Sequence, residues 1–363
     1  MTPPDFEAVA EQHEAKRLLS AALTEGTRHA YLLLGPPGVG KRELALLFAA
    51  ELLGDHVRVQ RRTHPDLYVL EPVGDQIRID DIRELRRDLH MRPFEASRRV
   101  YVLFAADSMN EDAADALLKD LEEPPPYAVI LLVADDLGPL PETILSRCQL
   151  VPFRRLSERA VSDAVRARAP ELTDEEVTTI ARVAGGRLDR AERLLDPAAA
   201  RRRETLLAVA RAVYLDPEFE AADGAQALLE GIAERGAEAK EKAEETVALL
   251  ELTGREAEQR VRRSQRGAER DELLAVLEEL EWWYRDLVVV AAGAEGAVVH
   301  VDRRDELRAD ASRERLLGAE RACEIVRAAW REAEELQISV PLALEALLVR
   351  LRRELVGRAL SGA

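Results

Sequence analysis

A glycine-rich stretch near the N-terminus has the spacing of a phosphate-binding loop. It fits the pattern G-x-x-x-x-G-K, with the members Gly35, Pro36, Pro37, Gly38, Val39, Gly40 and Lys41. An apolar strand pattern at 29–35 leads into it and a helical pattern at 41–53 follows it, which is the context that such a loop requires. Glycines let backbone N–H groups turn toward phosphate oxygens, and the helix N-terminus adds a favourable dipole. Lys41 is then expected to contact the outer phosphates of a nucleotide.

The residues that would hold Mg²⁺ beside this loop are missing. Arg42 stands where a Ser or Thr hydroxyl would bind the metal, and its permanent charge would repel a cation, cap the phosphates or point into solvent. The later strand pattern ends in Phe104, Ala105 and Ala106 instead of an acidic pair, and Asp107 follows as its single acid. Because phosphoryl transfer depends on placed charges, the sequence predicts a chain that does not hydrolyse ATP by itself. Weak binding of ATP or ADP remains open.

Three regions differ in their pattern along the chain. Residues 1–155 alternate apolar strand patterns with helical ones, which predicts an α/β core with a parallel sheet between helices. Residues 156–199 indicate three short helices, and residues 200–363 are helical and rich in charge, as in a packed bundle. Within the last region, 239–272 is a tract of mixed charge that is expected to be a solvated helix or helix pair.

Composition excludes several classes of protein. The 363 residues carry 69 acidic and 52 basic side chains, a net charge of −17, which argues against a protein that wraps nucleic acid broadly. Aromatic residues at 4% are too few for a base-stacking platform. No apolar run approaches the roughly 18 residues of a membrane span, and the polar N-terminus has no secretory signal. The distant Cys148 and Cys323 form no pair, so a cytoplasmic, reduced protein is expected.

Four sequence blocks occur in one order and together point to a family. They are "HAYLLLGPPGVGKRELA", "HPDL", "ADSMNEDAADALLKDLEEPP" and "LPETILSRCQLVPF". With them the chain resembles the delta-prime family of bacterial AAA+ clamp-loader subunits of DNA polymerase III. The resemblance covers residues 13–155, extends into 156–199, and in the C-terminal region is carried by the helix at 282–287.

The resemblance implies an architecture and a set of partners. It implies an AAA+ core at 1–155 with a degenerate phosphate loop, a three-helix lid at 156–199 and a helical collar at 200–363 for oligomerisation. The chain would be no enzyme by itself but a subunit of a DNA-directed DNA polymerase holoenzyme. Its partners would be the motor (gamma/tau) subunit and the delta subunit, with the sliding clamp and primer-template DNA reached through the complex and no membrane. A nucleotide-binding motor-type ATPase, or an ATP/ADP sensor of the same group, is the alternative.

The resemblance also implies roles for single residues. Arg147, between Ser146 and Cys148, matches an arginine finger that reaches the nucleotide of the neighbouring motor subunit; the alternative is an arginine that caps the strand-to-lid turn. Such a finger contributes about a thousandfold or more to the rate of phosphoryl transfer. Arg190 matches the lid arginine that touches nucleotide in AAA+ proteins, with a plain lid salt bridge as the alternative.

A zinc module of the family is absent from this sequence. Many relatives carry four cysteines before the "HPDL" block, whereas here the stretch contains none. His56 and His64 alone cannot form a tetrahedral structural site, so we expect neither zinc nor a magnesium site, and a capping or packing role for His64.

The remaining conspicuous residues favour structural roles. Cys148 is expected to be a small core residue, and the adjacent Trp282 and Trp283 should face different sides of one helix. The arginine cluster in 260–266 is interpreted as a solvated helix face, although contact with DNA or an acidic neighbour stays open. The Asp pairs at 80–81 and 135–136 are expected to cap helices or turns.

Overall fold

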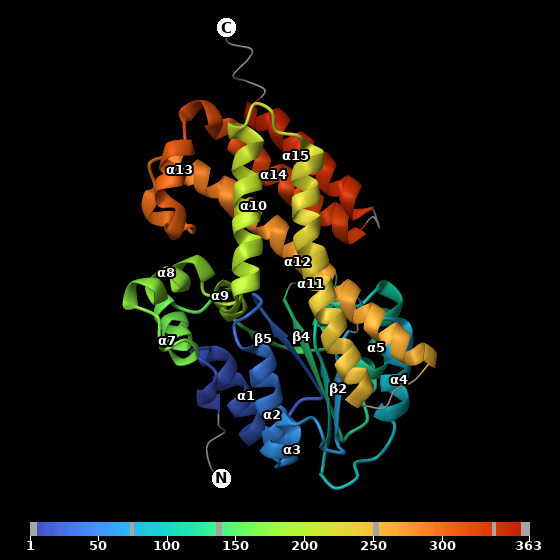
Figure 1. The fold of residues 1–363 in the computed structure, drawn as a ribbon. Coiled ribbons are helices and arrows are strands. Elements are labelled where there is room, and N and C mark those ends of the chain that lie inside the picture. Colours follow the sequence, from blue (N-terminus) through green and yellow to red (C-terminus); the bar gives the residue numbers. More distant parts are fainter. Residues whose placement is uncertain (1–5, 73–75, 136–139, 250–253, 336–338, 357–363) are drawn as a thin grey trace. The chain divides into compact units, whose positions relative to one another are not determined.

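The computed structural model describes residues 6–72, 76–135, 140–249, 254–335 and 339–356 (Figure 1). The chain forms two compact units. The first contains Met1–Arg168 with Ala184–Arg190, and the second contains Ala169–Val183 with Ala191–Ala363. The limits at 155 and 199 drawn from the sequence remain predictions.

The first unit is built on a sheet in which every recorded strand pairing is parallel. Among the described residues the sheet has five strands in the order β2-β3-β4-β1-β5. The strands are β1 (Ala30–Leu34), β2 (Leu67–Leu70), β3 (Arg99–Leu103), β4 (Ala128–Ala134) and β5 (Gln149–Pro152). Ala30 lies opposite Ile130 and Leu34 opposite Ala134, so all strand N-termini line one edge of the sheet and all C-termini line the other.

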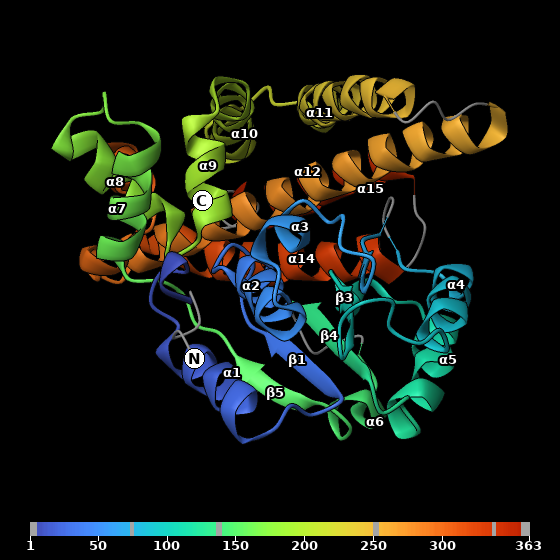
Figure 2. The ribbon, with the colours of Figure 1, turned by 90° about the horizontal axis from the view of Figure 1, so that it is seen from below.

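Helices cover both faces of this sheet. In β1, Tyr31 and Leu33 face the core beneath one pair of helices, α1 (His13–Glu25) and α2 (Lys41–Leu53). Leu32 faces the opposite core beneath α4 (Ile79–Leu89) and α5 (Glu111–Glu122). Figure 2 shows the sheet between these two layers. The strands are apolar on both sides because both faces are covered, and the α/β core predicted from the sequence is confirmed.

Shorter elements complete the first unit. They are η1 (Phe6–Ala8), α3 (His56–Gln60), η2 (Ala106–Ser108), α6 (Glu142–Leu145) and α7 (Glu158–Arg168). Helices α8 (Asp174–Ala184) and α9 (Leu188–Leu195) have residues in both units, so the expected three short helices of 156–199 are present.

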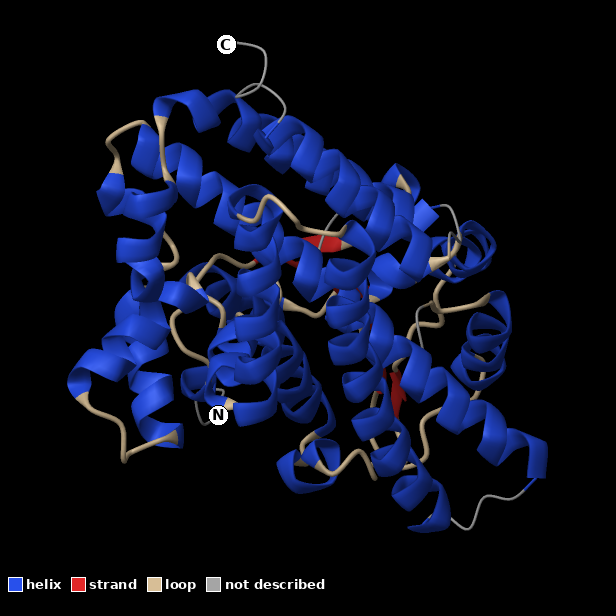
Figure 3. Cartoon of the chain, turned by 45° about the horizontal axis from the view of Figure 1, so that its top comes forward, coloured by secondary structure: helices blue, strands red, loops and turns tan. Residues whose placement is uncertain are grey.

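Among its described residues the second unit contains helices and loops but no strand. Figure 3 shows how strongly helices predominate in the chain. Its helices are α10 (Pro197–Leu215), α11 (Ala221–Leu249), α12 (Gly254–Ala291), α13 (Arg304–Asp310), α14 (Arg313–Glu335) and α15 (Val340–Val356), with the short η3 (Glu295–Ala297) and η4 (Val301–Arg303). The charged tract 239–272 is the end of α11 and the first half of α12, which pack against each other; 250–253 lie outside the described residues. No helix in the described parts of the chain combines the length and apolar character needed to cross a membrane.

The core of the helical unit contains a buried histidine between two carboxylates. His300 is fully buried, with Nδ1 2.8 Å from Asp286 Oδ2 and Nε2 3.1 Å from Glu279 Oε1. The Trp283 ring packs edge-on against it, whereas Trp282 is only half-buried, so the two tryptophans do face different sides of α12. Burial by itself disfavours the imidazolium, but the hydrogen bonds to Asp286 and Glu279 raise the pKa of His300 above its usual value.

This network predicts a pH-dependent stability. A histidine whose pKa is raised on folding stabilises the folded state fully below its unfolded pKa, and this stabilisation is lost as pH rises through the folded pKa. At pH 6, His300→Gln should therefore lower the free energy of unfolding by about 2 kcal/mol, because Glu279 and Asp286 lose a charged hydrogen-bond partner while their pairs with Arg203 and Arg285 remain. The difference from wild type should shrink as the pH is raised toward 9.5.

Urea unfolding followed by tryptophan fluorescence measures this difference, because Trp282, Trp283 and Trp330 all belong to the second unit. Arg321→Gln, which removes an exposed ion pair to Glu354, is the control and should cost under about 1 kcal/mol at every pH. A His300→Gln deficit that stays constant or grows with pH would contradict the assignment.

Candidate functional site

The predicted phosphate loop lies where the sequence places it, between the end of β1 and the start of α2. Gly40 is the N-cap of α2 and Lys41 its first residue. Val39 is buried in the core, and Pro36 and Pro37 are half-buried. The loop therefore has the geometry of a phosphate-binding turn at the C-terminal edge of the sheet, where ligands bind in open α/β folds.

Lys41 is occupied by groups of the same unit. Its side chain is only 4% exposed, and Nζ lies 2.7 Å from Asp135 Oδ1 at the end of β4. Nζ also donates to the carbonyl oxygens of Gly35 and Pro36. Burial lowers the pKa of Lys41, while the Asp135 carboxylate opposes this shift. The ammonium that should meet phosphate is thus neutralised within the protein.

A second carboxylate lies against the middle of the loop. Leu188, the first residue of α9, donates its N–H to the Gly38 carbonyl oxygen at 2.8 Å. A Cβ on Gly38 would stand 1.8 Å from Asp189 Oδ1, so the Asp189 side chain is packed directly on the loop backbone. Arg187 Nη2 is 2.7 Å from Asp189 Oδ2. Burial would raise the pKa of Asp189, but the hydrogen bonds from Arg187 and from backbone N–H groups lower it below its usual value, so the carboxylate is charged.

The two substitutions at the magnesium position touch each other. The guanidinium carbon of Arg42 lies 4.2 Å from the centre of the Phe104 ring, a cation–π contact. Phe104 is fully buried, and Arg42 is also paired with Glu71. Arg62 lies 3.0 Å from the same Glu71 carboxylate and 5.7 Å from the ring. Two guanidinium groups therefore occupy the side of the loop where a hydroxyl and two carboxylates would gather around a metal ion.

The one acid that follows β3 has a structural partner. Asp107 Oδ2 accepts a hydrogen bond of 2.9 Å from the backbone N–H of Asp135, the residue whose side chain binds Lys41. Ala105 adopts a left-handed conformation with φ of 50°, which starts the short helix η2 and directs the chain away from the strand. Asp107 thus holds the end of β4 in place.

Arg147 lies at the opposite edge of the sheet from the loop. It follows α6 and precedes β5, with Ser146 as the C-cap of that helix. Its Nη1 donates to the Thr143 carbonyl oxygen at 2.9 Å and to Ser146 Oγ at 3.1 Å, and Nη2 pairs with Glu122 at the end of α5. About a third of the Arg147 side chain is exposed. The guanidinium caps α6 and remains partly accessible, and its expected role as an arginine finger stays a prediction.

Cys148 has the character of a core residue. It is half-buried against the α4/α5 side of the sheet, and burial raises the pKa of its thiol to about 12. Both cysteines are free, and burial also raises the pKa of Cys323, to about 11. A thiol with so high a pKa is a poor nucleophile at neutral pH.

Arg190 is buried, with 6% of its surface exposed, one residue beyond the carboxylate that meets the loop. Its expected contact with nucleotide remains a prediction.

His64 is buried and accepts the Asp66 N–H on Nδ1 at 3.0 Å, with Nε2 3.3 Å from Glu95, which fits the packing role expected for it. His56 lies near the surface beside Glu51. Within the described ranges no group of three His, Cys, Asp or Glu side chains is placed to bind a metal ion.

Sequence reasoning missed Asp189, Glu71 and Arg62. Asp189 is more than a hundred residues from the loop in sequence, and Glu71 and Arg62 lie in a stretch with no motif. The one available signal was charge: an arginine placed beside a buried strand end requires a nearby carboxylate, and Glu71 directly follows β2, the strand beside β3.

The contact of Asp189 with the loop predicts coupled stabilities. Gly38→Ala should lower the free energy of unfolding by more than about 2 kcal/mol, because the new Cβ meets Asp189 and the φ of 65° strains an L-residue. Gly54→Ala is a matched control, since Gly54 has a φ of 70° with nothing within 4 Å. A double-mutant cycle with Asp189→Ala, followed by circular dichroism, should return a coupling of at least about 1 kcal/mol. Additive effects, or equal losses at Gly38 and Gly54, would show that Asp189 does not pack on the loop.

Known proteins resemble the part of the chain that carries this site. Residues 11–157 match the family model described as "DNA polymerase III, delta subunit". The DNA polymerase III subunit delta' of Bacillus subtilis is 32% identical over 160 residues, which cover 41% of this chain and 49% of that protein. The subunit delta' of Pseudomonas aeruginosa is 42% identical over 135 residues, which cover 33% of this chain and 41% of that protein. The DNA polymerase III subunit tau of Bacillus subtilis is 29% identical over 214 residues, which cover 54% of this chain and 38% of that protein. The matched region thus spans half or less of the length of these relatives.

Proposed function

Because residues 11–157 belong to the delta-prime-like family of DNA polymerase III clamp-loader subunits, we propose that this chain is a non-hydrolysing subunit of a bacterial clamp loader. It would help to load the sliding clamp onto primed DNA and would donate Arg147 to the ATP site of the neighbouring motor subunit. The observation that carries the proposal is the contact between Arg42 and Phe104, which fills the magnesium position with a cation and a hydrocarbon ring.

The absence of hydrolysis follows from electrostatics. A divalent cation at this position would approach two guanidinium groups, and the carboxylate beside them, Glu71, is already paired with both. Without the metal and without an acid to orient water, the phosphate loop lacks the charges on which phosphoryl transfer depends. Lys41 and Gly38 are occupied by Asp135 and Asp189, so nucleotide binding would have to displace two carboxylates. No cofactor is required in this proposal, and neither zinc nor magnesium.

The role of Arg147 is supported by its accessibility. Its partner Glu122 is half exposed, and ion pairs of this kind are worth about 1 kcal/mol or less. A phosphate group of a neighbouring subunit can therefore compete with Glu122 for the guanidinium. A planar fork of N–H donors is well matched to phosphate oxygens and would neutralise charge on the transferred group.

The partners in this proposal are the motor (gamma/tau) subunit and the delta subunit, with clamp and primer-template DNA met through the complex in the cytoplasm. A second candidate is a nucleotide-binding member of the same group, either a motor-type ATPase or an ATP/ADP sensor. The match to subunit tau and the intact loop residues, Lys41 included, favour it. Titration with a fluorescent ADP analogue separates the two, because micromolar or tighter binding by the isolated chain would favour the sensor.

The isolated chain should show no steady turnover of ATP with magnesium. The measurement is phosphate release by protein purified to homogeneity. Metal analysis of the same sample should find less than one zinc ion per chain. Sustained phosphate release that follows the protein through further purification would refute the proposal.

Arg147→Ala should lower the rate of ATP hydrolysis at the adjoining motor site by about a thousandfold. Arg147→Lys should recover only part of this loss, since an ammonium keeps the charge without the fork. The rates are measured in single-turnover experiments on the assembled, DNA-stimulated complex, with gel filtration to verify assembly.

The matched control is Arg154→Ala, another exposed arginine of the same unit, which should leave the rate unchanged. Equal rates for wild type and Arg147→Ala would refute the finger assignment.

A further inference from the structure

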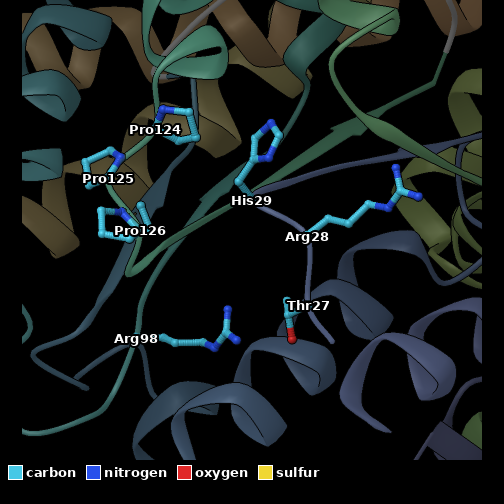
Figure 4. Close-up of a pocket in the computed structure, with 8 residues that line it drawn as sticks. Thr27, Arg28, His29, Arg98, Pro124, Pro125 and Pro126 are labelled. Atoms are coloured by element: carbon cyan, nitrogen blue, oxygen red, sulfur yellow. The ribbon is translucent and has the colours of Figure 1, made fainter. Parts of the chain in front are cut away.

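A pocket of about 410 Å³ lies at the N-terminal edge of the sheet, on the side opposite the phosphate loop. It is formed where the chain enters β1, β3 and β4. Its lining residues are Thr27, Arg28, His29, Arg98, Pro124, Pro125, Pro126 and Ala128. Figure 4 shows the three prolines along one side, Arg98 extending toward Thr27, and Arg28 along the other rim.

The pocket is cationic and its charges are not neutralised by the chain. Neither Arg28, His29 nor Arg98 has a recorded side-chain ion pair among the described residues, and no lining residue is acidic. Both arginines lie close enough to Tyr31 for their charge to act on its phenol. Burial raises the pKa of Tyr31, and the charges of Arg28 and Arg98 lower it. In a chain with 69 acidic and 52 basic residues, many arginines meet a carboxylate, as Arg99 meets Asp88 beside this pocket. An accessible group of cations without a carboxylate partner indicates a site for an anion.

The wall of the pocket distinguishes between a phosphate and a carboxylate. Many protein sites for phosphate add converging backbone N–H groups to their arginines, and the three prolines of this wall have no N–H to offer. Proline rings do offer an apolar surface against which the methylene groups of an aspartate or glutamate side chain can pack, while guanidinium groups bind its carboxylate. Binding along a nucleic-acid backbone would also be opposed by the net charge of −17.

The surroundings indicate a protein partner. Pro124 follows Glu122, the partner of Arg147, by two residues, so the pocket and Arg147 share one edge of the sheet. Phe94, in the segment that leads to Arg98, is 71% exposed, and Met91 is 50% exposed. Exposed Phe, Met and Arg side chains together are typical of protein–protein interfaces.

We propose that the Arg28–Arg98 pocket binds an acidic side chain of the neighbouring clamp-loader subunit, the one whose nucleotide Arg147 reaches. The identity of this partner rests on the proposed function, whereas the carboxylate chemistry rests on the pocket alone. The contact anchors the interface beside Arg147, so its loss weakens assembly without removing the finger.

Zero-length cross-linking tests the proposal in the assembled complex. Arg28→Lys and Arg98→Lys keep the charge and each adds an amine that a carbodiimide joins to a touching carboxylate as an amide. Mass spectrometry should find an amide from position 28 or 98 to an Asp or Glu of a partner subunit, which the isolated chain does not give. Arg159→Lys, on α7, is the control and should give no such link. A complex that assembles without any link at either position, or a link to a DNA phosphate, would overturn the proposal.

Charge reversal provides the second measurement. The double variant Arg28→Glu with Arg98→Glu should weaken assembly at least tenfold, while Arg159→Glu should leave it unchanged. Circular dichroism should show that wild type and both variants are folded. Equal affinity of the double variant and wild type would overturn the proposal.

If the wild-type chain joins no clamp-loader complex, the proposed function fails and the pocket is judged by itself. Calorimetric titration with a synthetic glutamate-rich peptide should then show binding that the double variant loses and that inorganic phosphate does not compete away. No difference between wild type and the double variant would count against the pocket.

Discussion

The parallel sheet of the first unit is the constraint on which the other features depend. Because the recorded pairings are all parallel, the strand C-termini gather at one edge with the phosphate loop, and the N-termini gather at the other with Arg147 and the pocket. The two edges have opposite electrostatic character. At the loop edge, Lys41, Arg42 and Arg187 each meet a carboxylate. At the other edge Arg147 pairs with Glu122, whereas Arg28 and Arg98 meet no carboxylate among the described residues.

Under the proposed function, this division would let a fold with a phosphate loop serve in an assembly without an ATP site of its own. At the loop edge, three groups hold β1, β4 and α9 together. They are the buried Lys41 ammonium, the Asp189 carboxylate packed on the loop and the Arg42 guanidinium stacked on Phe104. The other edge keeps accessible cations, and under the proposed function these act on a molecule outside the chain. In the proposed function, that molecule is the neighbouring clamp-loader subunit.

Much of the fold was predictable because its signals are local. Apolar runs with helical patterns between them predicted the α/β core, and the spacing of Gly35, Gly40 and Lys41 predicted the loop with the helix that follows. Arg42 and Phe104 also stood out in the sequence as unusual neighbours of such a loop. The contacts around the loop were not predictable, because the contact of Arg42 with Phe104 joins positions 62 residues apart and that of Asp189 with Gly38 joins positions 151 apart. The pocket was missed for the same reason, since its lining comes from three separate strand entries and contains no motif.

The stacking of Arg42 on Phe104 has a consequence for how this protein could change over time. Replacing Phe104 by an acid while Arg42 remains would place a carboxylate in a fully buried position, and replacing Arg42 by a small hydroxyl residue would uncover the ring and leave Glu71 with one cation fewer. Each single reversal passes through a less stable protein, although both together would rebuild part of a metal site. Under the proposed function, selection for folding alone would therefore be enough to keep both residues in place and the metal site absent.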